Sequence, residues 1–331
     1  MPDLVLRPSR RAFLGGAAGA GILLAAPRIA RAAPMMESLT LYGPPAGPSI
    51  TLAHAVAAGK LAGIAGTAAF APWKDPDELR AGLSSGQMQV VVMPTQAAAN
   101  LYNRGMGVRL VDVLTDGLVY AMTLAEGVAR IEDLGARRVA MPFRNDTPDI
   151  LTRRLVELAG VRDAEILAAG TPVEAAQMMA LGRAEVAILP EPAATMIRQR
   201  AGMIGKTVHR AFSLNDEWGR LTGLPPSLAQ AGLGVTADFD AAHPEAVEAI
   251  QAALAEAAAE VNADPEKAAP AAARALDMKP GVIAASIPFS HLVATPASVA
   301  RPALEGVLAE VMKVDPAILG GRLPDDGFYR L

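Results

Sequence analysis

Two stretches of the sequence match catalytic or cofactor motifs, and neither has the context that its chemistry needs. Gly82–Gly86 reads G-L-S-S-G and matches G-x-S-x-G, which presents a nucleophilic serine on a turn from a strand into a helix. Here a helical pattern precedes the motif and an apolar run follows it. Gly232–Ala237 matches the nucleotide motif G-x-G-x-x-A, but its glycines lie inside an apolar run instead of after one. We therefore predict no serine nucleophile and no nucleotide cofactor.

Titratable residues suggest no metal site and one candidate contact. The chain has four histidines without ligand spacing and no cysteine. Glu191 lies between two prolines at the end of an apolar run, so its side chain is expected to face a cleft. Charge compensation at a helix start explains Glu191 equally well. We predict no metal, no cofactor and no enzymatic activity.

Three apolar runs end in proline, and a helix start follows each of them. They lie within residues 90–98, 139–151 and 186–194. In the second, Thr147 is placed to cap a helix whose first residue is Pro148. The loop before that helix is the longest of the three and is where we expect specificity to lie.

Other helix starts carry similar residues. Thr171 with Glu174 matches the capping box, and Thr95 and Ser49 are placed to cap two further helices. Free N–H groups at a helix start can hold a carboxylate, sulfonate or phosphate, although ordinary capping explains each residue alone.

The elements that must position these residues alternate between strand and helix. In a first series we expect strands at 39–42, 67–70, 88–93 and 108–114 and helices at 49–59, 75–84 and 95–104. In a second series we expect strands at 119–125, 137–141, 164–168, 185–189 and 206–212 and helices at 148–159, 172–181 and 191–201. Such a β-α-β order predicts right-handed crossovers and mainly parallel sheets.

The remaining sequence completes the first series. A loop holding Trp218 leads to a strand at 231–236, and Ala-rich helices fill most of 238–313. We expect those helices to pack on the first sheet. The predicted fold class is α/β, with lobe 1 at 33–117 plus 222–331, lobe 2 at 118–221, and a ligand cleft between them.

Residues 1–32 are expected to be an export signal. Ser9–Leu14 reads S-R-R-A-F-L, a short apolar stretch follows, and Ala30-Arg31-Ala32 forms a cleavage pattern. Paired arginines before Phe and Leu resemble the twin-arginine type. A membrane anchor is the alternative, but about 13 Gly-rich residues are too few to span a bilayer. We expect a periplasmic protein without a lipid anchor, since no cysteine follows the signal.

The charge of the chain excludes one class of partner. Removing residues 1–32 takes away five Arg and one Asp, which changes the net charge from −4 to −8. Nucleic-acid binding needs a basic surface, so we do not expect it.

The order of elements, with four stretches of sequence, resembles a known family. These stretches are G-V-A-R-I-E-D-L-G-A-R-R-V-A-M-P at 127–142, L-V-E-L-A-G-V at 155–161, A-L-G-R-A-E-V-A-I-L-P-E-P at 180–192 and H-P-E-A-V-E-A-I at 243–250. They are similar to the nitrate/sulfonate/taurine-type substrate-binding proteins of ABC importers, which have the type II periplasmic binding fold. Glu185 departs from the family, which often has Asp there.

The resemblance implies a monomeric receptor that captures a small molecule and delivers it to a permease and its ATPase at the inner membrane. Trp73, Tyr120 and Trp218 are the aromatic residues expected near the cleft or hinge. Phe143 or Trp73 would cover an apolar part of the ligand, and Arg144 would oppose an anionic part. The implied ligand contacts are Tyr42, Pro45, Ser49, Trp73, Pro94, Thr95, Gln96, Phe143, Arg144, Asn145, Thr147, Thr171, Glu191 and Trp218.

Two other functions are compatible with the same fold. Similar proteins include enzymes of thiamine-precursor or menaquinone biosynthesis, and a periplasmic sensor subunit is the third possibility. The ligand stays open among nitrate, sulfonates, taurine, aromatic carboxylates, pyrimidines and metal chelates.

Overall fold

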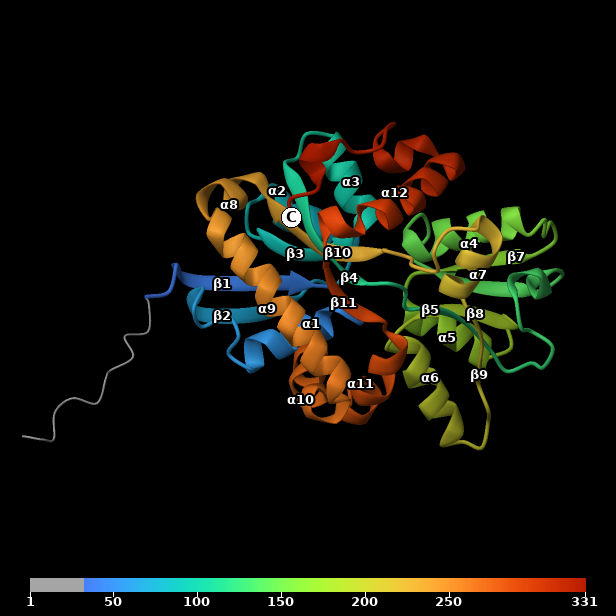
Figure 1. Cartoon of the computed structure of the whole chain (residues 1–331). Helices are drawn as coiled ribbons and strands as arrows, with labels where there is room; N and C mark the ends of the chain where they lie inside the picture. The colour runs from blue at the N-terminus through green and yellow to red at the C-terminus, as the bar shows by residue number, and fades with distance from the viewer. Residues whose placement is uncertain (1–32) are drawn as a thin grey trace, which may run out of the picture. The chain divides into compact units, whose positions relative to one another are not determined.

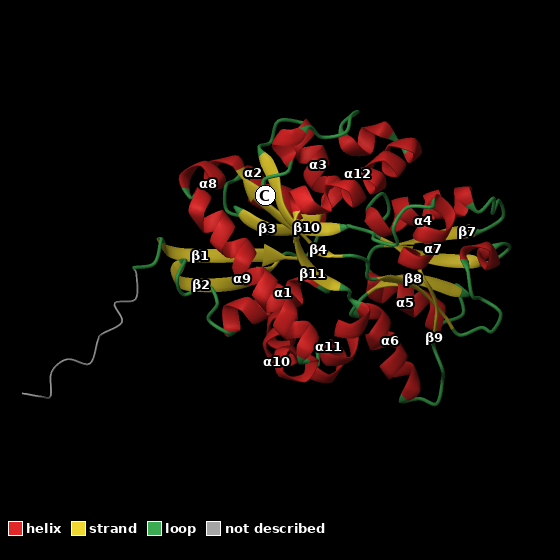
Figure 2. Cartoon of the chain, in the orientation of Figure 1, coloured by secondary structure: helices red, strands yellow, loops and turns green. Residues whose placement is uncertain are grey.

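Two separate β-sheets organise the chain (Figure 2). The computed structural model describes residues 33–331, of which Pro34–Leu331 form one compact unit. Within these residues the first sheet has the strand order β11 (Leu292–Pro296), β4 (Val108–Thr115), β10 (Ala231–Thr236), β3 (Val90–Pro94), β1 (Met36–Gly43) and β2 (Ala65–Pro72). The second has the order β7 (Glu165–Ala169), β6 (Arg138–Pro142), β8 (Val186–Pro190), β5 (Val119–Thr123) and β9 (His209–Ser213). The predicted export signal at residues 1–32 lies outside the described residues.

Strand direction follows from the connections, as the β-α-β order predicts. β1 pairs in parallel with β2 and β3, and β6 pairs in parallel with β7 and β8. β10 runs antiparallel between β3 and β4, and β5 runs antiparallel between β8 and β9. β5 and β10 are the strands that enter a lobe from the other lobe. Their first residues therefore lie at the same sheet edges as the carboxyl ends of the parallel strands.

Helices cover both sheets and define two α/β lobes (Figure 1). Around the first sheet lie α1 (Pro48–Ala57), α2 (Pro76–Ser84), α3 (Thr95–Asn103), α8 (Ala237–Ala242), α9 (Pro244–Ala263), α10 (Pro265–Leu276), α11 (Pro280–Ser286) and α12 (Ala297–Val314). Around the second lie α4 (Thr147–Leu158), α5 (Pro172–Ala180), α6 (Ala193–Gly202) and α7 (Leu214–Thr222). Short 3₁₀ turns cover Ile131–Leu134, Ile287–Phe289, Pro316–Leu319 and Asp326–Phe328.

The Ala-rich helices pack on the first sheet, as the sequence predicts. Val247, Ile250, Leu254 and Val261 follow one another at spacings of three, four and seven residues along one face of α9 and are all buried. The first three share a core cluster with residues of β1, β3, β4 and β10. α12 packs on β4 and also on α4 of the other lobe, so apolar side chains join the two lobes as well. No helix in the described part of the chain has the length and apolar content needed to cross a membrane.

Two crossing segments connect the lobes and are tied to each other. The first is Asp116–Leu118, between β4 and β5, and the second is 223–230, between α7 and β10. The backbone carbonyl of Asp116 accepts a hydrogen bond from the Leu228 N–H at 2.7 Å, and its carboxylate accepts one from the Ser227 hydroxyl at 2.8 Å. These bonds hold the two crossings side by side.

The structure corrects two local expectations. Trp218 lies on α7 and not in a loop, because Ser213 accepts a hydrogen bond from the Asn215 N–H and starts a helix there. Strand β11 was not predicted, because its five residues, L-V-A-T-P, form only a short apolar run between helical segments. The lobe boundaries at residues 118 and 221 stay a prediction.

Candidate functional site

The strand ends of both lobes meet at one cavity of about 100 Å³. Pro44 follows β1, Pro94 ends β3, Phe143 follows β6 and Pro190 ends β8. We call this space the inner cavity. It is lined by Pro44, Ala46, Pro48, Trp73, Met93, Pro94, Leu118, Val119, Phe143, Asp146, Thr147, Pro148, Pro190, Gln230 and Ala231. The lining comes from both sheets and from the starts of both entering strands, so the inner cavity depends on how the lobes meet.

The loop after β6 has an unusual backbone. Phe143 has a φ of 54° and Asn145 a φ of 64°, in the left-handed region that bulky residues rarely adopt. The Phe143 N–H donates to Ala169 O at 3.1 Å, and the Asp146 N–H donates to Phe143 O at 2.9 Å. Strained backbone of this kind clusters at ligand sites, where the surrounding structure holds it in place.

Helix α4 begins one residue earlier than predicted. Asp146 is the N-cap, and its carboxylate accepts the Thr147 N–H at 2.7 Å. Thr147 is the first helical residue, so the prediction of Thr147 as the cap is wrong. Asp is as good a cap as Thr, and capping by Asp146 leaves the Thr147 hydroxyl free for another contact.

That hydroxyl takes part in a contact between the lobes, which we call the Gln96 contact. The Gln96 amide group lies at the start of α3 in lobe 1. It donates to the Asp146 carboxylate at 2.8 Å and accepts from the Thr147 hydroxyl at 2.8 Å. Burial raises the pKa of Asp146, and the hydrogen bonds from Thr147 and Gln96 oppose that rise. Both partners of Gln96 line the inner cavity, so the contact lies beside it.

Two further side chains of the inner cavity stand out. The Trp73 indole N–H donates to Val92 O at 3.0 Å, which fixes the ring against β3. Gln230, at the end of the second crossing segment, is 5% exposed, and its Oε1 has no hydrogen-bond partner within residues 33–331. A buried acceptor without a partner costs about 1–3 kcal/mol. Gln230 Oε1 is therefore available to a donor on a bound molecule.

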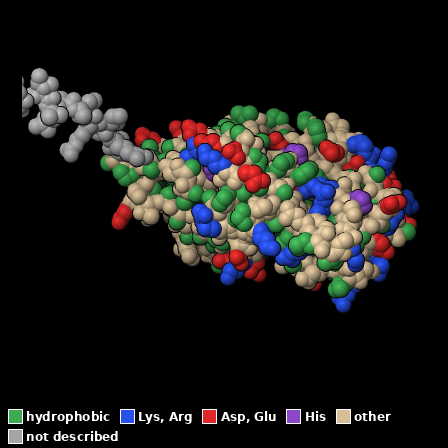
Figure 3. Space-filling view, turned by 90° about the horizontal axis from the view of Figure 1, so that it is seen from below, with side chains coloured by type: hydrophobic (Ala, Val, Ile, Leu, Met, Phe, Trp, Pro, Cys, Tyr) green, Lys and Arg blue, Asp and Glu red, His purple; other side chains and the backbone are tan. Residues whose placement is uncertain are grey.

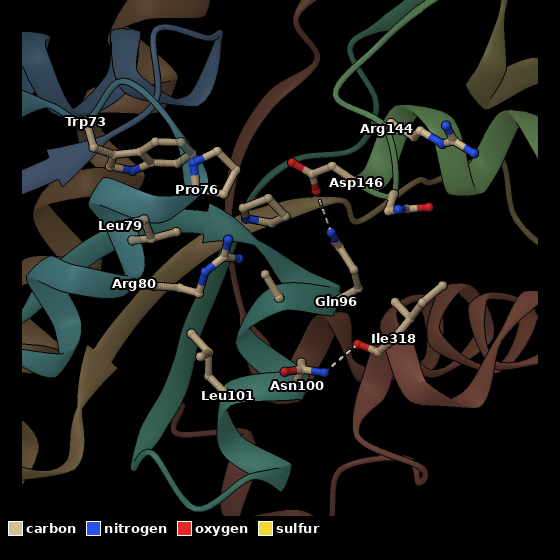
Figure 4. A pocket seen from close by; sticks show the side chains of 13 residues that line it. Trp73, Pro76, Leu79, Arg80, Gln96, Asn100, Leu101, Arg144, Asp146 and Ile318 are labelled. Atoms are coloured by element: carbon tan, nitrogen blue, oxygen red, sulfur yellow. Dashed lines mark hydrogen bonds between the residues drawn. The ribbon is translucent and has the colours of Figure 1, made fainter. Parts of the chain in front are cut away.

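A larger space, the outer cavity, adjoins the inner one and has a volume of about 350 Å³ (Figure 4). Trp73, Pro94 and Asp146 line both cavities. The other residues of the outer cavity are Pro76, Leu79, Arg80, Gln96, Ala97, Asn100, Leu101, Arg144, Asn145 and Ile318. It is thus more polar than the inner cavity and contains side chains from both lobes.

Seven of the fourteen predicted contacts line one of these cavities. They are Trp73, Pro94, Gln96, Phe143, Arg144, Asn145 and Thr147. The other seven are Tyr42, Pro45, Ser49, Thr95, Thr171, Glu191 and Trp218, which line neither cavity.

Several of the second group have structural partners instead. The Ser49 hydroxyl donates to Pro44 O at 2.5 Å and the Thr95 hydroxyl to Ala229 O at 2.7 Å. Neither Ser49 nor Thr95 caps its helix by a side-chain hydrogen bond, which corrects that prediction. Thr171 caps α5 as predicted, and Trp218 is buried in the hydrophobic core.

Glu191 is buried in an ion pair. Its carboxylate pairs with Arg210 of β9 and accepts the Thr195 N–H at 3.0 Å. Burial raises the pKa of Glu191, and the positive charge of Arg210 opposes the rise. The Arg210 guanidinium lies 3.5 Å from the centre of the Phe289 ring of lobe 1. Tyr120 of β5 donates to Phe289 O at 2.9 Å. We call Glu191, Arg210, Tyr120 and Phe289 the Arg210 cluster.

The lining residues outside the list of predicted contacts include Arg80, Met93, Asp146 and Gln230. Gln230 precedes the strand that enters lobe 1, and the first residues of an entering strand lie at the cleft edge. That rule could have found Gln230. Arg80 lies a full turn inside α2, and nothing in its spacing distinguishes it from a surface arginine.

The inner cavity contains one side chain that can exchange a proton. Asp146 is the one titratable side chain among the residues that line the inner cavity. Gly82 lies inside α2 and Ser84 ends it, so the G-x-S-x-G match forms no strand-to-helix turn. Gly232 and Gly234 lie inside β10, as predicted. In residues 33–331 no group of three or more His, Asp or Glu is placed to hold a metal ion.

Solved structures with this fold include binding proteins of ABC transporters. One is described as an ABC transporter from Parabacteroides distasonis. It has a TM-score of 0.74 and 21% sequence identity, with 89% of this chain and 98% of that chain covered.

A second is the periplasmic aliphatic sulphonate binding protein SsuA from Escherichia coli, with a TM-score of 0.66 and 14% identity over 89% of this chain and 96% of that chain. A third is the periplasmic nitrate-binding protein NrtA from Synechocystis, with a TM-score of 0.58 and 16% identity over 76% of this chain and 70% of that chain. These likenesses confirm the fold that the sequence resemblance implies.

Sequence comparisons add a family. No curated protein matches the chain significantly. A family model described as menaquinone biosynthesis matches residues 51–295, which is most of the chain. The chain therefore belongs to the family described as menaquinone biosynthesis, and it has the two-lobed fold of the nitrate- and sulfonate-type periplasmic binding proteins.

Proposed function

We propose that this protein is a periplasmic solute-binding protein that captures a small anionic or heterocyclic molecule between its lobes and delivers it to an ABC importer. The observation that carries this proposal is the inner cavity, which is built from strand ends of both lobes and lies beside the Gln96 contact. Ligands of open α/β sheets bind at this edge of the strands.

The geometry suits capture by closure. The inner cavity of about 100 Å³ is smaller than most small-molecule sites, which measure roughly 300–1,000 Å³. A ligand therefore enters while the lobes are apart or extends into the outer cavity. It stabilises the closed arrangement by binding that arrangement more tightly than the open one.

The remaining parts of the proposal follow from the sequence. We propose export by the twin-arginine route, a monomeric protein, and a permease with its ATPase as partners. Acidic and basic side chains are interspersed on the face of the described residues that Figure 3 shows. Such a surface favours a small-molecule ligand over nucleic acid.

A thermal-shift screen tests the capture of a ligand. Anions and small heterocycles are added to protein that begins at residue 33, and the melting temperature is measured. A ligand at 100 times its Kd stabilises the folded state by about 2.7 kcal/mol. We expect at least one compound to raise the melting temperature, and a flat response to the whole screen would contradict the proposal.

Tryptophan fluorescence then locates the bound compound. The chain has two tryptophans, and only Trp73 lines a cavity. In a Trp218→Phe variant the emission reports on Trp73 alone, so the compound should change its intensity or wavelength. The matched Trp73→Phe variant, which keeps Trp218, should show no such change.

The family match favours a second candidate, an enzyme of menaquinone biosynthesis. In that case the same cavity would hold a substrate, and Asp146 would be the side chain able to exchange a proton, since burial raises its pKa. Mass spectrometry of a bound compound separates the two functions. A binding protein returns its ligand unchanged, whereas an enzyme converts it, and Asp146→Asn would abolish the conversion.

A further inference from the structure

The inner and outer cavities differ in chemistry at the point where they meet. Apolar side chains, mainly proline, alanine and aromatic residues, dominate the lining of the inner cavity. The outer cavity adds the charged and amide side chains of Arg80, Gln96, Asn100 and Asn145. A molecule that occupies both would need an apolar part at one end and a polar part at the other.

Arg80 is the cation that faces this junction. Figure 4 shows its side chain extending from α2 into the outer cavity, while the guanidinium of Arg144 is directed away. The charge of Arg80 also opposes the rise in the pKa of Asp146, which lines both cavities. Arg80 therefore acts on the boundary between the apolar and polar spaces.

The existing partner of Arg80 holds it weakly. Within residues 33–331 its ion pair is with Asp77, three residues earlier on the same helix, at 2.6 Å. The two side chains are 60% and 90% exposed, and exposed pairs contribute about 0–1 kcal/mol. A guanidinium has five N–H donors, and Asp77 accepts one of them. Most of the donors of Arg80 are thus available to an anion.

Gln230 defines the opposite end of the site. Its buried Oε1 has no partner in the described chain and lies in the lining of the inner cavity. An acceptor at this place is satisfied by an N–H or O–H group on a bound ring. Trp73 and Phe143 line the same cavity and supply apolar surface for that ring.

We propose that the two cavities form one site for an aromatic or heterocyclic anion, whose ring lies in the inner cavity against Trp73 and Phe143 and whose carboxylate or sulfonate binds Arg80 in the outer cavity. This inference rests on the proposed function and names its ligand class. It assigns the counter-charge to Arg80 in place of Arg144, which the sequence suggested.

Matched pairs of charged and neutral probes test the assignment. Titration calorimetry compares benzenesulfonate with benzenesulfonamide, and 4-hydroxybenzoate with 4-hydroxybenzamide. The protein begins at residue 33 and is either unchanged or carries Arg80→Gln. The Arg144→Gln variant tests the competing assignment, because Arg144 also lines the outer cavity although its guanidinium is directed away from the junction.

We expect the unchanged protein to bind the anionic member of a pair at least about tenfold more tightly, since a hydrogen bond to a charged group is worth that much. Arg80→Gln should remove this preference and leave the neutral probes within about twofold. Arg144→Gln should keep it.

Three results would overturn the inference. The first is that the unchanged protein shows no preference for anions, including the case in which it binds no probe. The others are that Arg80→Gln weakens the binding of neutral probes as much as that of anionic probes, or that Arg144→Gln removes the preference for anions as fully as Arg80→Gln does. If the thermal-shift screen nevertheless finds a neutral ligand that changes Trp73 fluorescence, the proposed function stands and only the anionic class is wrong. If neither the probes nor the screen yield a ligand, both fail.

Discussion

The Gln96 contact and the Arg210 cluster both join the lobes, but they are built from different chemistry. Gln96 is a neutral amide that makes two hydrogen bonds of 2.8 Å to residues of the inner cavity. The Arg210 cluster contains a buried ion pair in lobe 2 whose cation stacks on Phe289 of lobe 1. It lies close to the first crossing segment, since the Asp116 N–H donates to His291 O, two residues beyond Phe289.

The difference shows which contact is suited to repeated opening. Hydrogen bonds between neutral groups contribute about 0.5–1.5 kcal/mol each and those to a carboxylate such as that of Asp146 about 1.5–3 kcal/mol, because water replaces them when they break. The Glu191–Arg210 pair lies within lobe 2 and stays intact when the lobes part. At this cluster the contacts between the lobes are the stacking of Arg210 on Phe289 and the hydrogen bond from Tyr120 to Phe289 O. They lie beside the crossing segments, where the lobes would move least. We infer that the lobes separate at the Gln96 contact and stay joined at the Arg210 cluster, next to the segments on which they would turn.

The largest effect is expected from Arg210→Met. Glu191 is fully buried, and without Arg210 its charge would keep only hydrogen bonds from the backbone and side chain of Thr195. We expect a loss of about 3–5 kcal/mol in the free energy of unfolding, measured by urea denaturation at pH 8. The double variant Glu191→Leu, Arg210→Met is the control and should recover most of the loss. A loss below about 1 kcal/mol in the single variant would show that the ion pair is dispensable.

Asp112 is a buried carboxyl that, unlike Glu191, has no cationic partner among the described residues. Asp112 of β4 is fully buried, accepts the Leu233 N–H at 3.2 Å, and has no partner for its Oδ2 among the described residues. Burial raises the pKa of Asp112 from 3.8 to about 7. Since the unfolded carboxyl releases its proton near pH 4, the folded state binds the extra proton between about pH 4 and pH 7.

Stability should therefore fall as the pH rises through that window and level off above it. Asp112→Asn removes the titrating group. Between pH 4 and pH 8 the free energy of unfolding should therefore fall by about 2–4 kcal/mol less in this variant than in the unchanged protein. Urea denaturation at several pH values measures the free energy of unfolding of both proteins. Parallel pH profiles for the variant and the unchanged protein would contradict the raised pKa.

The sequence predicts the framework well because the framework depends on local patterns. β-branched runs closed by Pro94, Pro142 and Pro190 mark strands whose ends share an edge, and the structure places all three at strand ends. The sequence does not predict pairing across the cleft. Gln96 and Asp146 are 50 residues apart and meet only because two sheets face each other.

The positions of Glu191, for which the sequence leaves two readings open, and of Trp218, which it places in a loop, have a physical cause too. A carboxylate at a strand end can face a cleft or pair with a cation from a neighbouring strand. Here Arg210 of β9 provides the partner, and no sequence spacing links the two. Trp218 was placed in a loop because Pro225 and Pro226 follow closely, but α7 ends before them at Thr222.

An intermediate effect is expected from Gln96→Leu, which tests the other half of the comparison. The change removes both hydrogen bonds across the lobes and leaves Asp146 and Thr147 without that partner. We expect the closed arrangement to lose about 1–2 kcal/mol relative to the open one, and hence a roughly tenfold weaker affinity for any ligand found in the screen. Small-angle X-ray scattering should show a larger radius of gyration than that of the unchanged protein. An unchanged radius and affinity would mean that the contacts of α4 with α12, which include apolar packing and the Arg154–Glu310 ion pair, hold the lobes together without Gln96.

The smallest effect is expected from Gln230→Met, which tests the inner cavity without changing the Gln96 contact or the Arg210 cluster. Methionine has nearly the same length and removes the unpartnered Oε1, so the ligand-free protein should keep its stability or gain up to about 1 kcal/mol. Binding of 4-hydroxybenzoate, whose hydroxyl can donate to Oε1, should weaken, whereas binding of benzenesulfonate, which has no such donor, should not. The pair of ligands matters because loss of a polar wall would weaken both. A clear loss of stability in the ligand-free variant would show instead that Gln230 supports the crossing segment, and the inner end of the site would then lack its acceptor.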